Sequence, residues 1–494
     1  MPVGPIRTLL LALCLALGPC PPCRADDPAP ALAAAIRRII EAPRYAAATW
    51  GVKVVSLDSG RVLFEHNAGK YFVPASNTKL FTAAMALQVL GPELRLRTSL
   101  YATARPGPDG AVDGDLILYG RGDPTLMRPW DGGPYRPDPL EDLARQLQDR
   151  GVRTVRGDLV GDDSYFNAPP YGPGWEWEDL GFAYGAAPSA LSLHHNVVDV
   201  WVYPGPTPGR PCFLFAQPGH GLASFSNAAT TCVPGAERPV RAERWPGEPS
   251  IHVSGSLAPG AAPVRLTLTV HDPALWSARL LERALARHGI QVRGRVRSLH
   301  ARDRTAPLEP GRLAELGHLE SPPMLEMLRM LSKESNNQYA QLILLQTGAQ
   351  RPGNGDTPAQ AMLAMAGWMA RAGLAPGDAL LEEGSGLSRK NLLKPDAVIQ
   401  VLAYMDRQPE AAAFRSLLPV AGVDGTLRAR LRSTPAQGNL AAKTGTLRGT
   451  HALSGYVTTA AGERLAFAIL RNNYPSTQPR PQADLDAIAE LLAE

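Results

Sequence analysis

A serine and a lysine, Ser76 and Lys79, are the first residues of this 494-residue chain whose types and spacing could carry out chemistry. The apolar pattern of residues 76–90 predicts a buried helix. Residues three apart share a helix face, so the two side chains should point the same way. A hydroxyl needs a base to become a nucleophile, and a desolvated lysine beside another cation can lose its proton near neutral pH. The pair therefore predicts a serine nucleophile activated by a lysine base.

The scarcity of lysine makes this pair more informative. Only seven of the 50 basic residues are Lys, and Lys79 is the only one with Ser three positions before it. Arg cannot give up its proton at any useful pH, whereas Lys can. Taken alone, the pair also fits a helix whose first turn is capped by a serine.

Two further segments have residue types suited to a peptide substrate. Ser335 and Asn337 lie in a predicted turn between two helical patterns, where a hydroxyl could relay a proton and an amide could hold a substrate amide. Segment 443–446 combines a cation, two hydroxyls and a position without Cβ on an expected edge strand, which would form a cradle for a carboxylate. Its residues are Lys443, Thr444, Gly445 and Thr446. An Asn-rich turn and a Thr-Gly hairpin would explain each segment separately, but not the three patterns in this order.

The order Ser-x-x-Lys, Ser-x-Asn, Lys-Thr-Gly is the signature of the serine penicillin-recognising enzymes. The chain resembles in particular the class C low-molecular-mass penicillin-binding proteins, which are D-alanyl-D-alanine carboxypeptidases/endopeptidases of peptidoglycan. The long insertion after the first motif carries this likeness, together with segments 161–164, 174–179, 384–389 and 421–427. The resemblance covers nearly the whole chain after residue 25. Glu383 is a small departure, since the family pattern has Asp before Gly-Ser-Gly.

The resemblance implies a role for each motif. Ser76 would form an acyl-enzyme, Lys79 would take its proton, and Ser335 would pass a proton to the leaving amine. The implied substrate-binding residues are Asn337, Lys443, Thr444, Gly445 and Thr446, with Arg389 and Asp179 as peptide-stem contacts that could equally be structural ion-pair partners. The implied partners are peptidoglycan peptides and, as covalent inhibitors, β-lactam antibiotics. No cofactor and no metal ion are implied.

Two rival functions share parts of this pattern. A β-lactamase of the same fold has all three motifs and an additional carboxylate for deacylation, which cannot be assigned here because a long insertion occupies the interval between the first two motifs. A non-catalytic wall-binding protein would be expected to lack Ser76, Lys79 or Lys443, and all three are present. The lifetime of the penicillin adduct separates the β-lactamase from the carboxypeptidase.

The predicted elements indicate an α/β (α+β) fold, a penicillin-binding-protein/β-lactamase-like transpeptidase domain that is split by a large, mostly β insertion forming two further domains. Residues 26–98 and 314–494 are expected to form the catalytic domain, residues 99–125 and 199–313 insertion domain II, and residues 126–198 insertion domain III. The catalytic part has long helical patterns and ends with strands over 447–458 and 464–471 and a final helix. The insertion is rich in Gly, Pro and short β-like segments.

The N-terminus has the pattern of a cleaved signal peptide over residues 1–25, with Arg7, an apolar run over 8–18 that is too short to span a bilayer, and small residues before Asp26. We therefore expect a periplasmic protein with at most peripheral membrane contact.

A composition of 45% hydrophobic and 19% charged residues excludes a disordered chain and a multi-span membrane protein. Without residues 1–25 the formal charge falls from +4 to +2, which gives no reason to expect nucleic-acid binding. Without residues 1–25, Cys212 and Cys232 are the two remaining cysteines, and the sequence is compatible both with a disulfide between them and with two free thiols.

Overall fold

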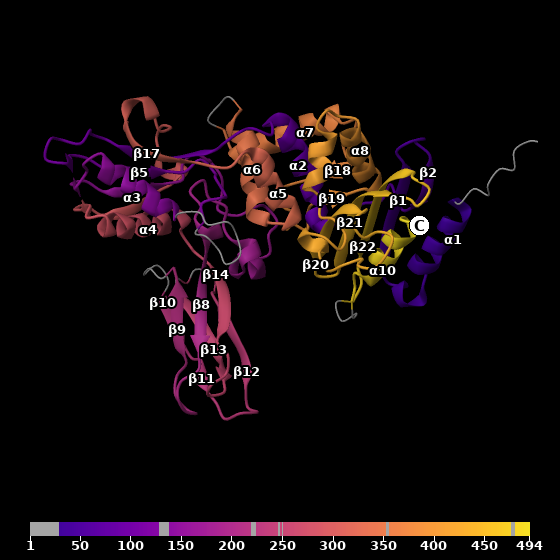
Figure 1. The fold of residues 1–494 in the computed structure, drawn as a ribbon, viewed down its shortest axis with the longest axis horizontal. Coiled ribbons are helices and arrows are strands. Elements are labelled where there is room, and N and C mark those ends of the chain that lie inside the picture. The colour runs from indigo at the N-terminus through magenta and orange to yellow at the C-terminus, as the bar shows by residue number, and fades with distance from the viewer. Residues whose placement is uncertain are drawn as a thin grey trace, which may run out of the picture.

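The computed structural model describes residues 29–127, 138–218, 224–245, 248, 250–351, 355–475 and 480–494. Figure 1 shows two parts, an α/β domain formed by the two ends of the chain and an insertion that begins with strand β3 (Arg97–Ala102) and ends with strand β17 (Ala314–Glu320). The predicted signal peptide, residues 1–25, lies outside the described residues. Within the described part, no helix is long and apolar enough to cross a membrane.

The central sheet of the α/β domain is antiparallel, with the strand order β2-β1-β22-β21-β20. Its strands are β1 (Thr49–Ser56), β2 (Val62–His66), β20 (Ala441–Leu447), β21 (Thr450–Thr458) and β22 (Arg464–Asn472). The edge strand expected at residues 443–446 is β20. Alternate residues of β21 belong to different cores, Ala452 and Tyr456 to one and Leu453 and Val457 to the other, because both faces of the sheet are covered.

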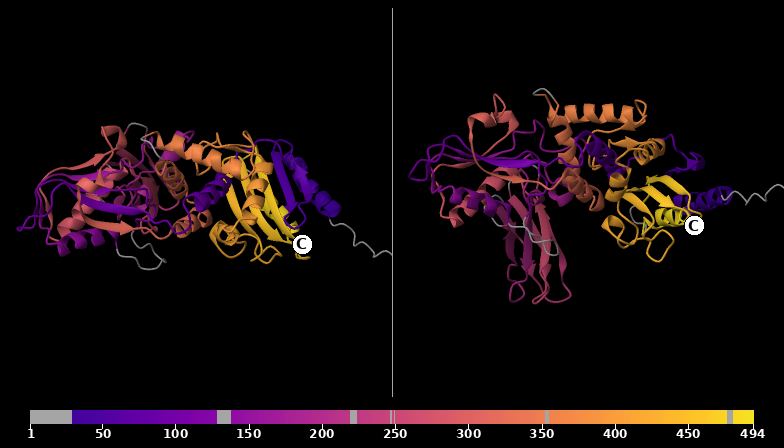
Figure 2. Two further views of the ribbon diagram at one scale, coloured as in Figure 1. Left: turned by 90° about the horizontal axis from the view of Figure 1, so that it is seen from above. Right: turned by 45° about the horizontal axis from the view of Figure 1, so that its top comes forward.

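Helices cover the two faces of this sheet unequally (Figure 2). The larger core lies under α2 (Thr78–Val89), α5 (Met324–Lys333), α6 (Asn337–Ala349), α7 (Thr357–Arg371), α8 (Pro395–Asp406) and α9 (Ala411–Leu417). The other face packs against α1 (Ala29–Ile40) and α10 (Ala483–Leu491). Every residue of α2 from Thr78 to Leu87 is buried, as expected for a helix that is apolar on nearly all sides. The amine of Lys79 therefore lies in the interior of the domain.

The first part of the insertion is a five-stranded sheet with the order β16-β7-β5-β3-β17. Strands β5 (Leu116–Tyr119), β7 (Leu159–Asp162) and β16 (Val296–Leu299) pair in parallel. Helices α3 (Pro139–Asp149) and α4 (Pro273–Arg287) contribute the apolar residues of the core beside it. A small parallel sheet of β4 (Ala111–Val112), β6 (Thr154–Val155) and β15 (Gln291–Val292) extends this unit.

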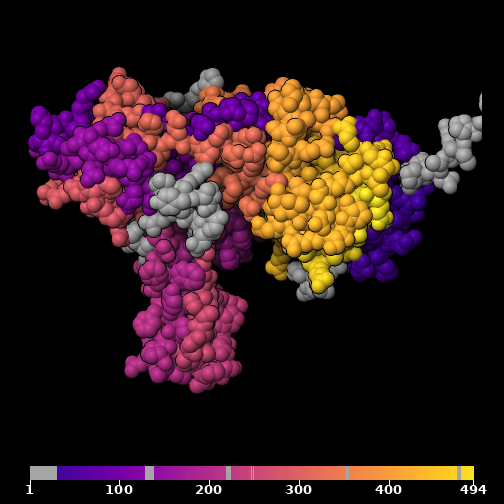
Figure 3. Space-filling model, viewed as in Figure 1, coloured from indigo at the N-terminus to yellow at the C-terminus, as the bar shows by residue number. Residues whose placement is uncertain are grey.

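Residues 197–269 form a second β unit that projects from the rest of the molecule (Figures 1 and 3). Its strands are β8 (Val197–Tyr203), β9 (Phe213–Gln217), β10 (Ser224–Asn227), β11 (Thr230–Thr231), β12 (Arg238–Glu243), β13 (Ser250–Leu257) and β14 (Val264–Thr269). This grouping differs from the expected division into 99–125 with 199–313 and 126–198. The reason is that β7, within 126–198, pairs with β5 and β16 and not with strands of its own segment.

The two cysteines of the projecting unit are free thiols, so the structure does not contain the disulfide that their spacing allowed. The Cys212 N–H donates to the carbonyl of Ala229, 2.9 Å away, whereas the Cys232 N–H donates to Leu257, also at 2.9 Å. Cys212 thus lies opposite a residue three positions before Cys232. The two cysteines are therefore not paired directly in the backbone register.

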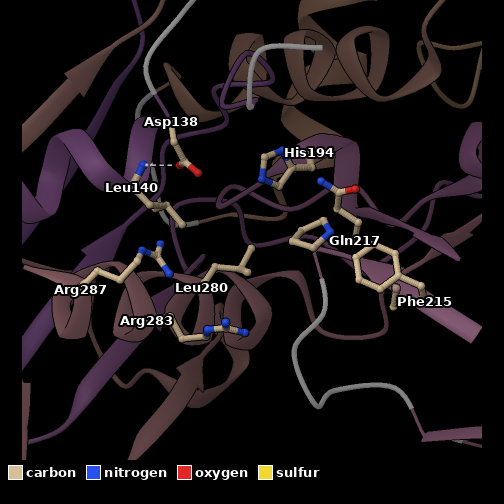
Figure 4. A pocket seen from close by; sticks show the side chains of 10 residues that line it. Asp138, Leu140, His194, Phe215, Gln217, Leu280, Arg283 and Arg287 are labelled. Carbon is tan, nitrogen blue, oxygen red and sulfur yellow. Dashed lines mark hydrogen bonds between the residues drawn. The ribbon is translucent and has the colours of Figure 1, made fainter. Parts of the chain in front are cut away.

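A pocket of about 370 Å³ lies in the insertion where α4 faces β9 (Figure 4). Arg283 and Arg287 reach it from α4, Phe215 and Gln217 from β9, and His194 from the segment before β8. None of its lining residues belongs to the α/β domain, which carries all three motifs. This pocket is therefore separate from the site that the motifs predict.

The family-like segment 161–164 forms side-chain contacts between the ends of strands β7 and β16 of the insertion sheet. The Asp162 carboxylate pairs with Arg304, and the Ser164 Oγ accepts a hydrogen bond from the Arg304 Nε at 2.6 Å. Asp163 contacts the Nδ1 of His300 at 2.8 Å. These residues connect the ends of β7 and β16, so this segment is structural.

We expect the protein to lose stability as the pH rises from 6.5 to 10. Hydrogen bonds to Asp163 and Asp272 raise the pKa of His300 to about 10. A histidine whose pKa is raised by folding stabilises fully below its unfolded value of 6.5, and this contribution is lost as the pH rises through the folded value. With allowance for solvent screening, the loss is roughly 2 kcal/mol. The measurement is the free energy of unfolding of the wild type minus that of His300→Gln at pH 6 and pH 10.5. A difference that stays the same at both pH values would contradict this prediction.

Candidate active site

Ser76 and Lys79 face each other at the start of α2. Residues 75–77 form a 3₁₀ turn, and α2 itself begins at Thr78, so Ser76 lies one turn ahead of the regular helix. The Lys79 Nζ is 2.9 Å from the Ser76 Oγ. Ala75 has a φ of 48°, a left-handed conformation that is costly for a residue with a side chain. The backbone immediately before Ser76 is therefore strained, as is common where a fold fixes a functional group.

The surroundings of Lys79 suit a neutral amine. Besides Ser76, its Nζ contacts the Asn337 Oδ1 at 2.6 Å and the carbonyl of Ser385. A neutral amine has two N–H donors for these two oxygens and a lone pair for the hydroxyl proton of Ser76. Burial lowers the pKa of Lys79 to about 7, although the negative charge of Glu383 acts in the opposite direction. A substantial fraction of Lys79 is therefore deprotonated at neutral pH.

Ser335 and Asn337 approach the first motif from the junction of α5 and α6. Ser335 has a φ of 56° and lies between the two helices, and Asn336 caps α6 by accepting from the Tyr339 N–H at 3.1 Å. This arrangement directs Asn337 toward Lys79, while its Nδ2 donates to the Tyr184 carbonyl at 2.9 Å. The turn that the sequence predicted thus brings an amide to the lysine.

Lys443 connects the second motif to strand β20. It is fully buried, and its Nζ is 2.8 Å from the Ser335 Oγ and 2.9 Å from the Thr444 carbonyl. Burial lowers the pKa of Lys443, and the nearby Lys79 lowers it further. Two buried lysine amines with lowered pKa values therefore contact the two serines. The Thr444 Oγ1 shares a hydrogen bond of 2.8 Å with the Thr426 Oγ1.

The open edge of β20 has backbone donors that point away from the sheet. Ala442 donates its N–H to the Pro419 carbonyl at 2.9 Å, outside the sheet. Because successive N–H groups alternate along a strand, those of Thr444 and Thr446 point to the same open side. The Thr446 side chain is exposed. This edge can thus bind an extended peptide or an oxyanion.

Gly445 has a packing role that the sequence analysis did not anticipate. A Cβ at this position would lie 2.6 Å from the Pro74 carbonyl oxygen and 3.2 Å from the Ala75 Cβ. The missing side chain lets β20 pack directly against the turn that carries Ser76. Asn77 reinforces this contact by donating from its Nδ2 to the Lys443 carbonyl at 2.9 Å. Gly445 is therefore required by the approach of two backbones and not only by an open cradle.

Arg389 and Asp179 lie at the rim of the site but do not pair with each other. The Arg389 Nε contacts Glu176 at 2.9 Å, and its guanidinium also donates to the Arg448 carbonyl at 3.1 Å. Asp179 accepts a hydrogen bond from Tyr184, and burial raises the pKa of Asp179. An open cleft of about 960 Å³ lies beside Arg389, lined by Trp175, Glu176, Trp177, Glu178, Arg389, Arg448, Gly449 and Tyr474.

Several residues of the site were not identified from the sequence. Glu383 is 1% exposed and lies near Lys79, and Ser385 contacts that lysine through its carbonyl. The only sequence signal was Glu383 itself, an acid before a Gly-Ser-Gly segment. Tyr184 and Thr426 contact the motifs through a backbone carbonyl and a hydroxyl, respectively, and neither position has a spacing that marks it.

Comparisons with known proteins agree with the family resemblance drawn from the motifs. The family model described as D-Ala-D-Ala carboxypeptidase 3 (S13) matches residues 32–494. A D-alanyl-D-alanine carboxypeptidase of an Actinomadura strain is 37% identical over 470 residues, covering 93% of this chain and 84% of the relative. The D-alanyl-D-alanine carboxypeptidase DacB of Haemophilus influenzae is 28% identical over 434 residues, covering 85% of this chain and 84% of the relative.

Solved structures give the same result for the fold. The crystal structure of penicillin binding protein 4 (dacB) from Haemophilus influenzae is similar with a TM-score of 0.79 and 26% identity, covering 92% of this chain and 97% of that chain. The same protein in complex with a β-lactam gives a TM-score of 0.74 at 24% identity, over 92% and 97% of the two chains. The resemblance inferred from the motifs and the expected fold class are confirmed, and the chain belongs to the D-Ala-D-Ala carboxypeptidase 3 (S13) family.

Proposed function

We propose that the protein is a serine-type D-alanyl-D-alanine carboxypeptidase/endopeptidase that cleaves peptidoglycan stem peptides or cross-links and is acylated by β-lactams. The observation that carries this proposal is the 2.9 Å contact between the Ser76 Oγ and a buried lysine whose pKa lies at about 7. Family membership over residues 32–494 supports the same activity.

Acylation begins with attack of the Ser76 Oγ on the carbonyl of a D-Ala-D-Ala-type bond, while Lys79 accepts the hydroxyl proton. The carbonyl oxygen becomes an oxyanion, for which the N–H groups of Ser76 and Thr446 are the donors. Each such donor stabilises the transition state by roughly 3 kcal/mol in other acyl-transfer enzymes. Because Lys79 is already desolvated, it serves as a base at neutral pH without rearrangement of the site.

The leaving amine needs a proton as the C–N bond breaks. Ser335 relays it: its hydroxyl, held by Lys443 at 2.8 Å, gives its proton to the amine and regains the one that Lys79 took from Ser76, so that Lys79 is again neutral. Thr444 and Thr446 bind the terminal carboxylate of the substrate at the open edge of β20, and Asn337 holds a substrate amide. Water then attacks the acyl-enzyme, which releases the shortened peptide and restores the Ser76 hydroxyl.

The rim of the site suits a peptide stem. The cleft beside Arg389 is lined by two indole rings, those of Trp175 and Trp177, together with acidic and basic groups. Aromatic and charged side chains in an open cleft can hold both the aliphatic and the ionic parts of a peptide. Arg389 and Asp179 would contact the stem at this rim.

We infer that the protein acts outside the cytoplasmic membrane. The signal-peptide pattern of residues 1–25 supports export. The proposed substrate, the peptide part of the cell wall, lies on that side. Detection of the mature chain beginning at Asp26 in a periplasmic fraction would test this location.

Ser76→Ala should abolish covalent labelling by penicillin and the release of D-alanine from purified muropeptides. The substitution removes the attacking oxygen, so no acyl-enzyme can form. Ser59→Ala, in an exposed hairpin turn, is the matched control and should be labelled at the wild-type rate. Undiminished labelling of Ser76→Ala would place the nucleophile elsewhere. Rapid turnover of penicillin by the wild type would indicate a β-lactamase instead, and digestion of cross-linked muropeptides separates endopeptidase from carboxypeptidase activity.

A further inference from the structure

Glu383 is a carboxylate in the interior of the α/β domain with four hydrogen-bond donors. It is 1% exposed. One oxygen accepts from the Ser385 N–H at 2.8 Å and from the Ser385 hydroxyl, and the other accepts from the Gly386 N–H at 2.6 Å and the Asn391 Nδ2 at 2.7 Å. Four donors on two oxygens are the complement of an ionised carboxylate, which only accepts. A buried charge is tolerated in a protein when it is satisfied in this way.

The loop that Glu383 holds is in contact with both halves of the first motif. The Ser385 carbonyl accepts a hydrogen bond from the Lys79 Nζ. Gly386 packs against the turn before Ser76 so closely that a Cβ there would lie 3.0 Å from the Ser76 nitrogen. The loop is also fastened to α2, because Thr82 donates to the Gly384 carbonyl at 2.8 Å. Movement of this loop would therefore displace the base and the nucleophile together.

Charge is the second way in which Glu383 acts on Lys79. Lys79 is surrounded by α2, α6, β20 and this loop, and among the described residues the charge that shifts the pKa of Lys79 is that of Glu383 from the loop. Lys443 of β20 is the other titratable group beside it, and the charge of Lys79 lowers the pKa of Lys443. The negative charge of Glu383 favours the ammonium form of Lys79, which opposes the effect of burial. Glu383 thus keeps the amine more basic than burial alone would leave it, and a stronger base is the better proton acceptor.

We propose that Glu383 is a positioning residue for acylation, which fixes the Ser385 carbonyl on the Lys79 Nζ and supplies the negative charge that tunes this base. The inference rests on the proposed role of Lys79. It goes beyond the three motifs, because Glu383 touches neither the reacting serine nor the substrate edge of β20. The adjacent acid provides a natural comparison, since the only ion pair of the Glu382 side chain within the described part of the chain is an exposed one with Lys390 at 3.8 Å.

The test is the pH dependence of the second-order rate of acylation by a penicillin, measured for the wild type, Glu383→Gln and Glu382→Gln. In the wild type the rate should rise with pH through about 7, the pKa of Lys79. In Glu383→Gln the pKa of Lys79 should fall, so this rise should move to lower pH by about one unit. The plateau at high pH should drop by about tenfold, because the base is weaker and the Ser385 carbonyl is no longer held. Glu382→Gln should match the wild type in both respects.

A double variant moves the charge instead of removing it. In Glu383→Gln, the NH₂ group of the new side chain would face hydrogen-bond donors such as the Asn391 Nδ2. In the double variant Glu383→Gln/Asn391→Asp, this NH₂ group can donate to the carboxylate at position 391. The other oxygen at position 391 can still accept from the Glu382 N–H, as the Asn391 Oδ1 does at 2.7 Å. This double variant should restore the pH position of the rise. It also decides the question if the single variant does not fold.

The outcomes separate the two levels of inference. If Glu383→Gln acylates more slowly but with its rise at the wild-type pH, Glu383 is only a structural residue and the proposal is overturned. If the acylation rate of the double variant still rises at a lower pH than that of the wild type, the proposal is overturned as well. If the wild type shows no rise near pH 7, the proposed base itself is wrong, and the inference about Glu383 fails with it.

Discussion

Lys79→Arg should abolish acylation of Ser76 by penicillin although the positive charge at that position is kept. An arginine side chain stays protonated at every useful pH, so it offers no lone pair to the Ser76 hydroxyl. General-base assistance contributes about 10² to 10⁴ in rate, and we expect the labelling rate to fall by at least about 10³-fold. The measurement is the rate of covalent labelling at pH 8, where the wild-type lysine is mostly neutral.

The same substitution at another lysine provides the control. Lys394 pairs with Asp378 at 3.0 Å in the ion pair next to α8, where only its charge is required, and Lys394→Arg should be labelled at the wild-type rate. Lys79→Met fills a similar length without a charge and should be as inactive as Lys79→Arg while remaining folded. Labelling of Lys79→Arg within tenfold of the wild type would show that Lys79 is not the base.

The motif residues could be predicted to act together because their types, and not only their positions, indicate chemistry. Nothing in the spacing of Ser335 and Lys443, more than 100 positions apart, predicts that their side chains meet, yet a hydroxyl and a cation suited to one reaction lie 2.8 Å apart. The i, i+3 argument for Ser76 and Lys79 is local, and it holds although Ser76 lies in a 3₁₀ turn and not in α2.

Residues that act through the backbone could not be found in this way. Ser385 binds Lys79 with its carbonyl, a group that every residue carries, so its identity gave no signal. The strand pairing within the insertion could not be predicted for a related reason, because the parallel pairing of β7 with β5 and β16 joins segments separated by long stretches of chain. Patterns within a segment determine that a strand forms, but its partners depend on the packing of the whole sheet.

Gly386→Ala should reduce the rate of acylation by about 10²-fold or more, which is the second large effect we expect. The new methyl group would overlap the Ala75 carbonyl and approach the Ser76 nitrogen, so the turn that carries the nucleophile must move away from Lys79 and β20. A displacement of about 1 Å at a reacting group is enough for a loss of this size. The measurement is again the rate of penicillin labelling, accompanied by thermal unfolding of the same sample.

Gly386→Ala would both displace the turn of Ser76 and strain its own backbone, and these two effects must be separated. An alanine substitution at Gly462 serves as the control for backbone strain. Gly386 has a φ of +84° and Gly462 a φ of +86°, but a Cβ at Gly462 meets no atom of the described residues within 4 Å. Both alanine variants therefore bear the same conformational cost of about 1 kcal/mol, and only Gly386→Ala pushes on the turn of Ser76. Gly462→Ala should lose stability and keep its labelling rate. If Gly386→Ala also kept its rate, the contact between this loop and the nucleophile's turn would have no part in setting the geometry of acylation. Loss of the rate in Gly386→Ala alone would show that the loop over α2 positions the serine as well as the lysine.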